Sequence, residues 1–264
     1  MCSSDLIFGK SLNITVAGDS TLSTNVTSLT ANVTGAGSTL TINEADDLTI
    51  AAAGIINPNG DVNLYAAGDI NGTAGTIQAI NLDVAANSAI LLTNVTSLTG
   101  TIWGSGGAGL KVTEADDLSV GAADITSTGD PIALTLTAGN LSGPGTINAA
   151  AGDVSLNANS GNITLNTTSS QVSGNNLTVR AQNSSALNTA VNGLTATITN
   201  ATDTLTIVEA NNLAILAGNV TTAGGDISIT ALTGSGTING PGVLNAGGGN
   251  VALQARDGIF LNTS

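Results

Sequence analysis

The chain has 264 residues, a net charge of −14 and four basic residues, Lys10, Lys111, Arg180 and Arg256. Phosphate groups are neutralised by clustered cations, so neither nucleic acid nor an anionic membrane is an expected partner. Hydrophobic residues are 41% of the chain but aromatic residues only 2%, so the interior must be narrow and filled by small aliphatic side chains. No apolar run approaches the roughly 20 residues that cross a bilayer, so direct membrane insertion is not expected.

The first residues stand apart from the rest. Met1 to Leu6 reads MCSSDL, which does not fit the pattern that follows, and a common sequencing adapter would encode Cys-Ser-Ser-Asp-Leu. The lone Cys2 cannot form an intrachain disulfide. We therefore expect residues 1–8 to be a non-native or disordered scar, and residues 9–264 to form a single repeat domain.

Short stretches with two aliphatic residues one apart recur along the whole chain. Examples are Leu40 to Ile42 (LTI), Val62 to Leu64 (VNL), Leu118 to Val120 (LSV) and Ile227 to Ile229 (ISI). Such alternation places the aliphatic residues on one face and Thr, Ser or Asn on the other, as in a half-buried strand. The spacers contain Gly-Asp, Gly-Asn and Asn-Gly pairs, which turn the chain sharply.

Three long copies organise these strands. Val26 to Ile50, Val95 to Val120 and Val191 to Ile215 each end in Glu-Ala-(Asp/Asn)-(Asp/Asn)-Leu and a short strand. The positions of the glutamates differ by 114 − 44 = 70 and by 209 − 114 = 95. These two spacings differ in turn by 95 − 70 = 25, about one coil of a solenoid. We therefore expect the short unit to hold roughly three coils and the long unit roughly four.

A second marker gives nearly the same spacings. Asn-(Leu/Ile)-x-Val begins at Asn13, Asn81 and Asn176, with separations of 81 − 13 = 68 and 176 − 81 = 95. The internal units therefore begin near residues 13, 81 and 176.

A sub-repeat of the form Gly-(Asp/Asn)-aliphatic-x-aliphatic marks the single coil. It begins at Gly60, Gly152, Gly225 and Gly249, and the last two are offset by 249 − 225 = 24. An antiparallel sandwich is the alternative, but identical strings at multiples of one coil favour stacking of like on like. The sequence predicts an all-β parallel β-solenoid of roughly 11 coils of about 22–25 residues each.

Strings such as Gly60 to Asn71 (GDVNLYAAGDIN) and Ala151 to Ala158 (AGDVSLNA) resemble the repeats of filamentous-haemagglutinin-like proteins. These are the large exported partners of two-partner (type V) secretion. The resemblance implies a right-handed parallel β-helix, export through an outer-membrane transporter of the two-partner type, and an adhesive role outside the cell or at the bacterial cell surface. The secretion domain of that family is not recognisable in the chain.

Two acidic strings are candidate calcium ligands. Asp46 and Asp47 follow Glu44, Asp116 and Asp117 follow Glu114, and the third copy carries two Asn residues at the same positions. Carboxylate oxygens suit Ca²⁺. A tight turn accepts Asp and Asn equally, however, and explains the third copy without a metal. We favour the turn and expect no cofactor.

Catalytic chemistry is not expected. The chain has no His, so a Ser-His-Asp or Cys-His set is excluded, and the isolated cations do not suit a polysaccharide lyase. Trp103 stands where the sister copies carry Thr34 and Thr199. An exposed Trp can stack on a sugar ring, which makes Trp103 the candidate ligand contact, although a single aromatic residue more often covers a local patch.

The sequence therefore predicts a non-enzymatic shaft or adhesin segment of a large secreted or surface-exposed bacterial protein, presenting a distal binding region to an unknown receptor or glycan. The alternatives are a polysaccharide-active β-helix enzyme and an ice-binding solenoid. The last would use outward Thr-x-Thr pairs such as Thr39/Thr41 and Thr204/Thr206.

Overall fold

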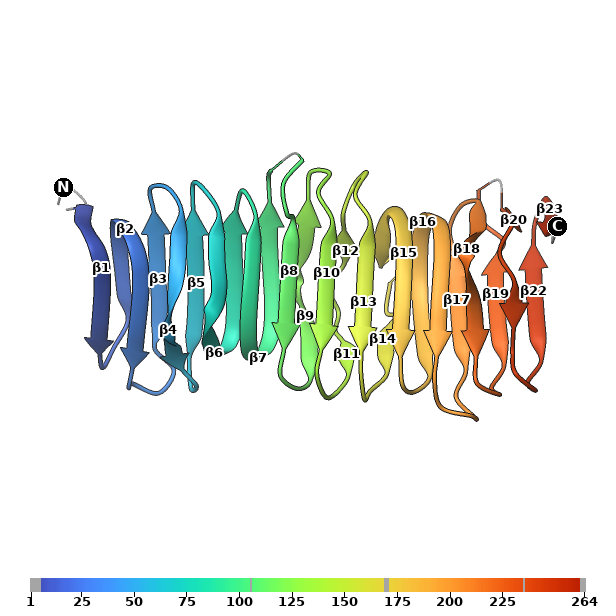
Figure 1. The fold of residues 1–264 in the computed structure, drawn as a ribbon, viewed down its shortest axis with the longest axis horizontal. Coiled ribbons are helices and arrows are strands. Elements are labelled where there is room, and N and C mark those ends of the chain that lie inside the picture. Colours follow the sequence, from blue (N-terminus) through green and yellow to red (C-terminus); the bar gives the residue numbers. More distant parts are fainter. Residues whose placement is uncertain (1–5, 105, 169–170, 235, 262–264) are drawn as a thin grey trace.

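The computed structural model describes residues 6–104, 106–168, 171–234 and 236–261, and the regular structure in these ranges is entirely β-strand. All of the strand pairings in these ranges are parallel. Figure 1 shows the coils following one another along the long axis, with β1 and β23 at opposite ends. The chain is therefore a parallel β-solenoid, as predicted.

The first half of the chain contains β1 (Leu6–Val16), β2 (Ser20–Val33), β3 (Thr39–Glu44), β4 (Leu48–Asn57), β5 (Asp61–Ala66), β6 (Ile70–Ala86), β7 (Ala89–Ile102), β8 (Leu110–Glu114), β9 (Leu118–Ser127), β10 (Ile132–Leu136), β11 (Leu141–Ser142) and β12 (Ile147–Asn148). The second half contains β13 (Val154–Ala158), β14 (Ile163–Leu165), β15 (Val172–Ala181), β16 (Ser185–Ile198), β17 (Leu205–Glu209), β18 (Leu213–Thr222), β19 (Ile227–Ala231), β20 (Thr237–Gly240), β21 (Leu244–Asn245), β22 (Val251–Ala255) and β23 (Gly258–Leu261).

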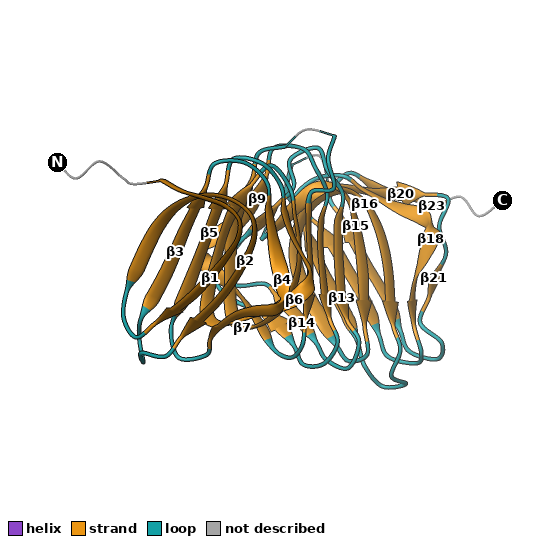
Figure 2. Cartoon of the chain, turned by 60° about the vertical axis from the view of Figure 1, so that its left-hand side comes forward, coloured by secondary structure: helices purple, strands orange, loops and turns teal. Residues whose placement is uncertain are grey.

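The register divides these strands into two stacks, which Figure 2 shows with the loops gathered at their edges. Stack A consists of β3, β5, β9, β11, β12, β14, β17, β19 and β22. Stack B consists of β4, β8, β10, β13, β18, β20, β21 and β23. The long strands β1, β2, β6, β7, β15 and β16 each run from one stack into the other. We call the crossing from stack A to stack B edge 1, and the return crossing edge 2.

Eleven coil-to-coil steps connect Ser20 to Val251 in stack A, which agrees with the predicted number of coils. The partners in order are Ser20, Leu40, Val62, Leu82, Leu98, the β9 strand, Leu141, Ile163, Ser185, Leu205, Ile227 and Val251.

One continuous aliphatic core lies between the stacks. The inward residues of the two stacks belong to a single hydrophobic cluster, and most of them are less than 3% exposed. Alternation along the strands is as predicted: Leu118 is buried and Thr34 is exposed. Burying one Leu, Ile or Val side chain contributes about 1.5–3 kcal/mol to the free energy of folding. The stability of the core is therefore spread over many similar columns of side chains along the axis.

Coil length varies more widely than the sequence pattern predicts. The positions of register partners differ by 98 − 82 = 16 at Leu82 and Leu98, and by 238 − 213 = 25 at Leu213 and Ile238. The shortest coils occur where the three long copies begin, because there one uninterrupted strand crosses an edge with no turn. The partners Leu177 and Leu194, for example, give a difference of 194 − 177 = 17.

The three long copies do not lie on the same side of the solenoid. Glu44 ends β3 and Glu209 ends β17, both in stack A, whereas Glu114 ends β8 in stack B. The stretch from Glu44 to Glu114 therefore makes three and a half coils, and the stretch from Glu114 to Glu209 makes four and a half. The expected whole numbers, three and four, were wrong by half a coil, although the difference of one coil is correct.

The solenoid begins earlier than expected. Residues 6–8 belong to β1 and pair with β2, so they are part of the fold and not of a separate N-terminal segment. The expectation for residues 1–5 lies outside the described residues.

Candidate functional site

Each long copy places a glutamate inside the solenoid. Glu44, Glu114 and Glu209 are 4%, 0% and 1% exposed. Each carboxylate accepts a hydrogen bond from the N–H of the next residue, at 2.9 Å for Ala45, 2.7 Å for Ala115 and 2.9 Å for Ala210. The side chain thus folds back over the turn that follows it and gives these N–H groups a second acceptor, because they also donate to the carbonyls of Thr24, Thr93 and Thr189 one coil earlier.

The same carboxylates reach the preceding coil. The N–H groups of Val26, Val95 and Val191 donate to Glu44, Glu114 and Glu209 respectively, at 3.1–3.3 Å. In two copies the threonine two residues before the valine also donates its hydroxyl to the glutamate. The distances are 2.8 Å from Thr24 to Glu44 and 2.7 Å from Thr189 to Glu209. We call this unit, a glutamate and the Thr-x-Val string one coil before it, the glutamate clamp.

Burial governs the ionisation of two of these groups. Burial raises the pKa of Glu114 and of Glu209 above the ordinary value, because the charged form loses its hydration. The hydrogen bond from Thr189 to Glu209 and the backbone N–H groups that donate to both carboxylates act in the opposite direction without cancelling that effect. The buried N–H groups of the clamp thus require the carboxylate oxygens as acceptors, whereas burial makes the charged form of the same carboxylate less favourable.

The calcium candidates lie on the outside of the turn. Asp46, Asp47, Asp116 and Asp117 are all exposed, whereas the glutamate beside each pair points inward. In the ranges that the structure describes, no three His, Cys, Asp or Glu side chains are close enough to hold a metal ion together. Sequence proximity thus does not bring the acidic string together as one ligand set.

The second aspartate of each pair has a structural partner instead. Asp47 Oδ1 accepts the N–H of Asp69 at 2.8 Å, and Asp117 Oδ1 accepts the N–H of Asn140 at 2.6 Å. In the third copy Asn212 Oδ1 accepts the N–H of Thr237 at 3.0 Å. One side-chain oxygen is all that this bond requires, so Asp and Asn serve equally. These bonds give the second residue of each pair a structural use within the turn, while calcium binding by Asp46, Asp47, Asp116 and Asp117 is not tested by them.

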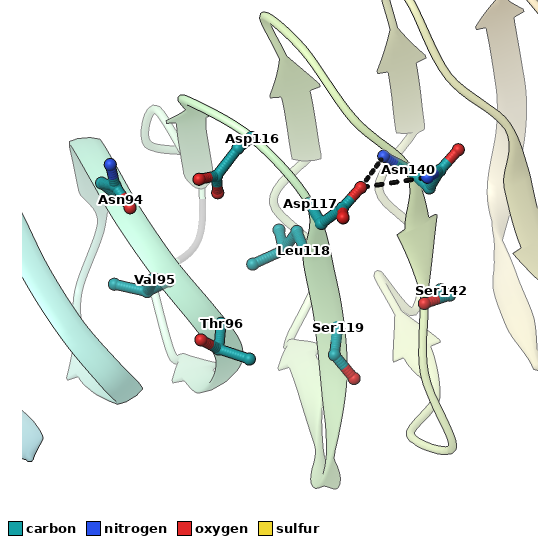
Figure 3. A pocket seen from close by; sticks show the side chains of 9 residues that line it. All are labelled: Asn94, Val95, Thr96, Asp116, Asp117, Leu118, Ser119, Asn140 and Ser142. Carbon is teal, nitrogen blue, oxygen red and sulfur yellow. Dashed lines mark hydrogen bonds between the residues drawn. The ribbon is translucent and has the colours of Figure 1, made fainter. Parts of the chain in front are cut away.

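A groove of about 500 Å³ opens beside the middle clamp. Asn94 and Thr96, on the part of β7 that crosses the edge without a turn, form one wall, and the protruding turn with Asp116 and Asp117 forms the other (Figure 3). Leu118, Ser119, Asn140 and Ser142 complete the lining with Val95. The groove exists because a short coil lies next to a longer one, and its polar lining is made of hydroxyl, amide and carboxylate groups.

Trp103 does not line this groove. It follows β7 and is 44% exposed. The backbone N–H of Trp103 donates to the carbonyl oxygen of Ala86. The backbone N–H groups of Thr34 and Thr199 make the equivalent bond to the carbonyls of Val16 and Ala181. The expected correspondence of the three positions is therefore confirmed, while contact of Trp103 with a ligand stays a prediction.

Two features were not recognised in the sequence. Gly54, Asp124 and Asn219 occupy the same place in the bend of each copy, and all have positive φ, of 72°, 68° and 65°. The signal was available, because Gly, Asn and Asp are the residues that tolerate this conformation.

The second feature is an outward network in stack A. Tyr65 donates to Asp83 Oδ2 at 2.8 Å and Thr99 donates to Asp83 Oδ1 at 2.7 Å. Burial, then the hydrogen bond and the charge of Asp83, raise the pKa of Tyr65 to about 12. These three residues belong to successive coils, so only the register reveals their contact.

Outward ladders are mixed in composition. In stack A the partners Thr41, Asn63, Asp83 and Thr99 follow one another. A flat ice-binding array requires Thr at the same position in successive coils, and this ladder does not have that regularity.

No family model matches the chain, and neither the curated proteins nor the solved structures contain a significant match. The described residues also include no helix long and apolar enough to cross a membrane.

Proposed function

We propose that this chain is a shaft segment of a large secreted or surface-exposed bacterial protein, holding a distal binding region away from the cell. The observation that supports this most is how the repeated polar residues are used. The clamp glutamates, and the Asp or Asn three residues after each, make hydrogen bonds between adjacent coils. Residues that recur in every copy thus maintain the stack.

The mechanism is mechanical. Each coil contacts mainly its two neighbours, so stability accumulates along the axis and length can be extended by adding coils. Eleven steps at the strand spacing of about 4.8 Å correspond to a rod of roughly 50 Å. The net charge of −14 favours solubility of the rod and opposes contact with anionic surfaces.

Single-molecule pulling from the two termini tests the mechanical part. A shaft of this kind is expected to unfold in successive steps, each of which releases the length of chain that one or a few coils hold. Release of the entire chain in one step would contradict a solenoid that bears load coil by coil.

Binding assays separate a shaft from an adhesin. A passive shaft is expected to bind neither host cells nor a glycan array. Specific binding that is lost in Trp103→Ala, but kept in the matched position variant Thr199→Ala, would instead identify this segment as the adhesive part. The export route by a two-partner transporter is part of the same proposal, and a secretion assay with and without such a transporter tests it.

A further inference from the structure

A polar hollow of about 210 Å³ lies over three successive coils of stack B, where β13, β15 and β16 end. The polar residues that line it are Asn157, Asn159, Arg180, Gln182 and Thr199. Asn157 and Arg180 are register partners, and strands of adjacent coils are about 4.8 Å apart. The stacking thus brings together side chains that are distant in the sequence. We call this feature the Arg180 hollow.

The backbone beneath the Arg180 hollow is already paired. Ala158 and Ala181 form its floor and are 0% and 3% exposed. The N–H groups of Asn159, Gln182 and Thr199, each the first residue after its strand, donate to carbonyls of the preceding coil. A ligand in the hollow would therefore meet the outward side chains and not the backbone.

The side chains of the hollow have no partners among the described residues. In these ranges the one ion pair joins Arg256 to Asp257, and the one hydrogen bond from an arginine side chain also comes from Arg256. Nearby amides bond elsewhere, as Asn200 does to Asn183. The guanidinium of Arg180 and the amides beside it therefore keep their N–H donors for a ligand.

The charge around the hollow differs from that of the rest of the chain. Arg180 is the only charged residue between Asp153 and Asp203, in a chain that carries −14. Asp153 precedes Asn157 by four residues of extended chain, about 13 Å, which exceeds the screening length of about 8 Å at physiological ionic strength. Asp203 accepts the hydroxyl of Ser184 at 2.7 Å. The chain itself thus leaves the positive charge of Arg180 without a carboxylate partner.

From these observations we propose that the Arg180 hollow binds a small oxyanion, such as sulfate or a carboxylate. The planar guanidinium of arginine matches two oxygens of such an anion with two parallel hydrogen bonds. The amide groups of Asn157 and Gln182 supply further N–H donors from the same and the preceding coil. A bound anion connects adjacent coils, so it adds a ligand-dependent contact to the stack.

Nuclear magnetic resonance tests the site directly, because the chain has only two arginines. The signals of their Nε–H groups are assigned by the variant Arg180→Gln, which removes one of them. Titration with sodium sulfate at constant ionic strength is expected to shift the Arg180 signal to saturation. The Arg256 signal, beside Asp257, is expected to change little. An Arg180 signal that does not shift, or that shifts without saturating, would overturn the proposal.

Two variants distinguish a built site from an exposed charge. Gln182→Met keeps the shape of the side chain without its amide and is expected to raise the dissociation constant for sulfate about threefold, the effect of one ordinary hydrogen bond. Lys111→Gln removes a positive charge from an outward position of stack B whose ladder neighbours, Ile90 and Ala133, are apolar. It is expected to bind sulfate as the wild type does. Unchanged affinity in Gln182→Met, or an equal loss in Lys111→Gln, would contradict a site made by the hollow.

Thermal denaturation measures the effect of the anion on the stack. Sulfate stabilises folded proteins in general because it is excluded from their surfaces, so the comparison between variants carries the result. The denaturation midpoint of the wild type and of Lys111→Gln is expected to rise more with sulfate than that of Arg180→Gln. An equal rise in all three would show that no anion bound at Arg180 stabilises the coils.

Discussion

The turns at Glu44–Asp47 and at Glu209–Asn212 make the same hydrogen bonds with different residues. In both, a nearly inaccessible glutamate accepts the N–H of a valine and the hydroxyl of a threonine from the preceding coil. In both, the last residue accepts an N–H from the following coil, although Asp47 is a carboxylate and Asn212 an amide.

The difference shows how strongly position determines the residue. The inward site has several donors and little solvent, so it requires a side chain with two acceptor oxygens, and Glu occurs in all three copies. The outward site has one donor and abundant water, so any short side chain with one oxygen suffices. A carboxylate that recurs in a repeat protein can therefore be present because buried backbone N–H groups require its oxygens as acceptors.

The largest expected effect follows from removing the inward acceptor. Glu209→Leu leaves the N–H of Val191 and the hydroxyl of Thr189 without the partner that they have in the folded chain. Each buried donor left unpaired costs about 1–3 kcal/mol, so we expect a loss of about 3 kcal/mol in the free energy of unfolding. Urea denaturation followed by circular dichroism measures it.

Glu44→Leu is the matched variant and is expected to lose a similar amount, because Val26 and Thr24 are left in the same state. A neutral result for both variants would show that the glutamate clamp does not stabilise the stack.

A pH dependence of the clamp is the next effect in size. The pKa values of Glu114 and Glu209 are raised in the folded chain above the ordinary value of 4.5, so folding takes up protons at these groups. Their contribution to stability is fully present below pH 4.5 and is lost as the pH rises through the raised pKa of the folded state. Lowering the pH from 7 to 4.5 is therefore expected to stabilise the chain through these groups.

General charge repulsion in an acidic protein changes with pH in the same direction, so a control is needed. The double variant Glu114→Gln, Glu209→Gln keeps the remaining carboxylates and is expected to show a shallower dependence of the denaturation midpoint on pH. Parallel curves for the wild type and the double variant would assign the whole effect to general repulsion.

The smallest effect is expected for exchange at the outward position. Asp47→Asn and Asn212→Asp each keep the accepting oxygen, so the free energy of unfolding should change by less than about 0.5 kcal/mol. Asp47→Ala removes that oxygen and is expected to cost about 1 kcal/mol. The same denaturation assay distinguishes them, and a large cost for Asp47→Asn would show that the negative charge itself is required.

Much of the fold could be predicted because the aliphatic alternation is local. Residues such as Leu118 and Ile227 belong to strings whose pattern alone assigns them inward, and recurrence at about one coil indicates parallel stacking. The half-coil offset between copies could not be read in this way. It arises where Thr93 to Leu98 crosses an edge inside one strand, and no glycine or proline marks that crossing.

The glutamate clamp was missed for a different reason. Glu44 stands beside Asp46 and Asp47, so the three read as one acidic cluster, although the strand alternation that buries Leu40 and Ile42 also buries Glu44. A signal was present one coil earlier. Thr-x-Val precedes the glutamates at offsets of 44 − 24 = 20, 114 − 93 = 21 and 209 − 189 = 20. Only a stacked register explains why these distant strings recur together.

The half-coil offset determines on which side of the rod each clamp lies. Successive clamps face alternate sides, and the first and third face the same side only after 3.5 + 4.5 = 8 coils. At about 4.8 Å per coil, the first and third clamps are about 38 Å apart along the axis. A flat surface lying along the rod would meet the exposed turn that follows every second clamp, and a bivalent molecule that binds two of these turns from one side would need to span that distance.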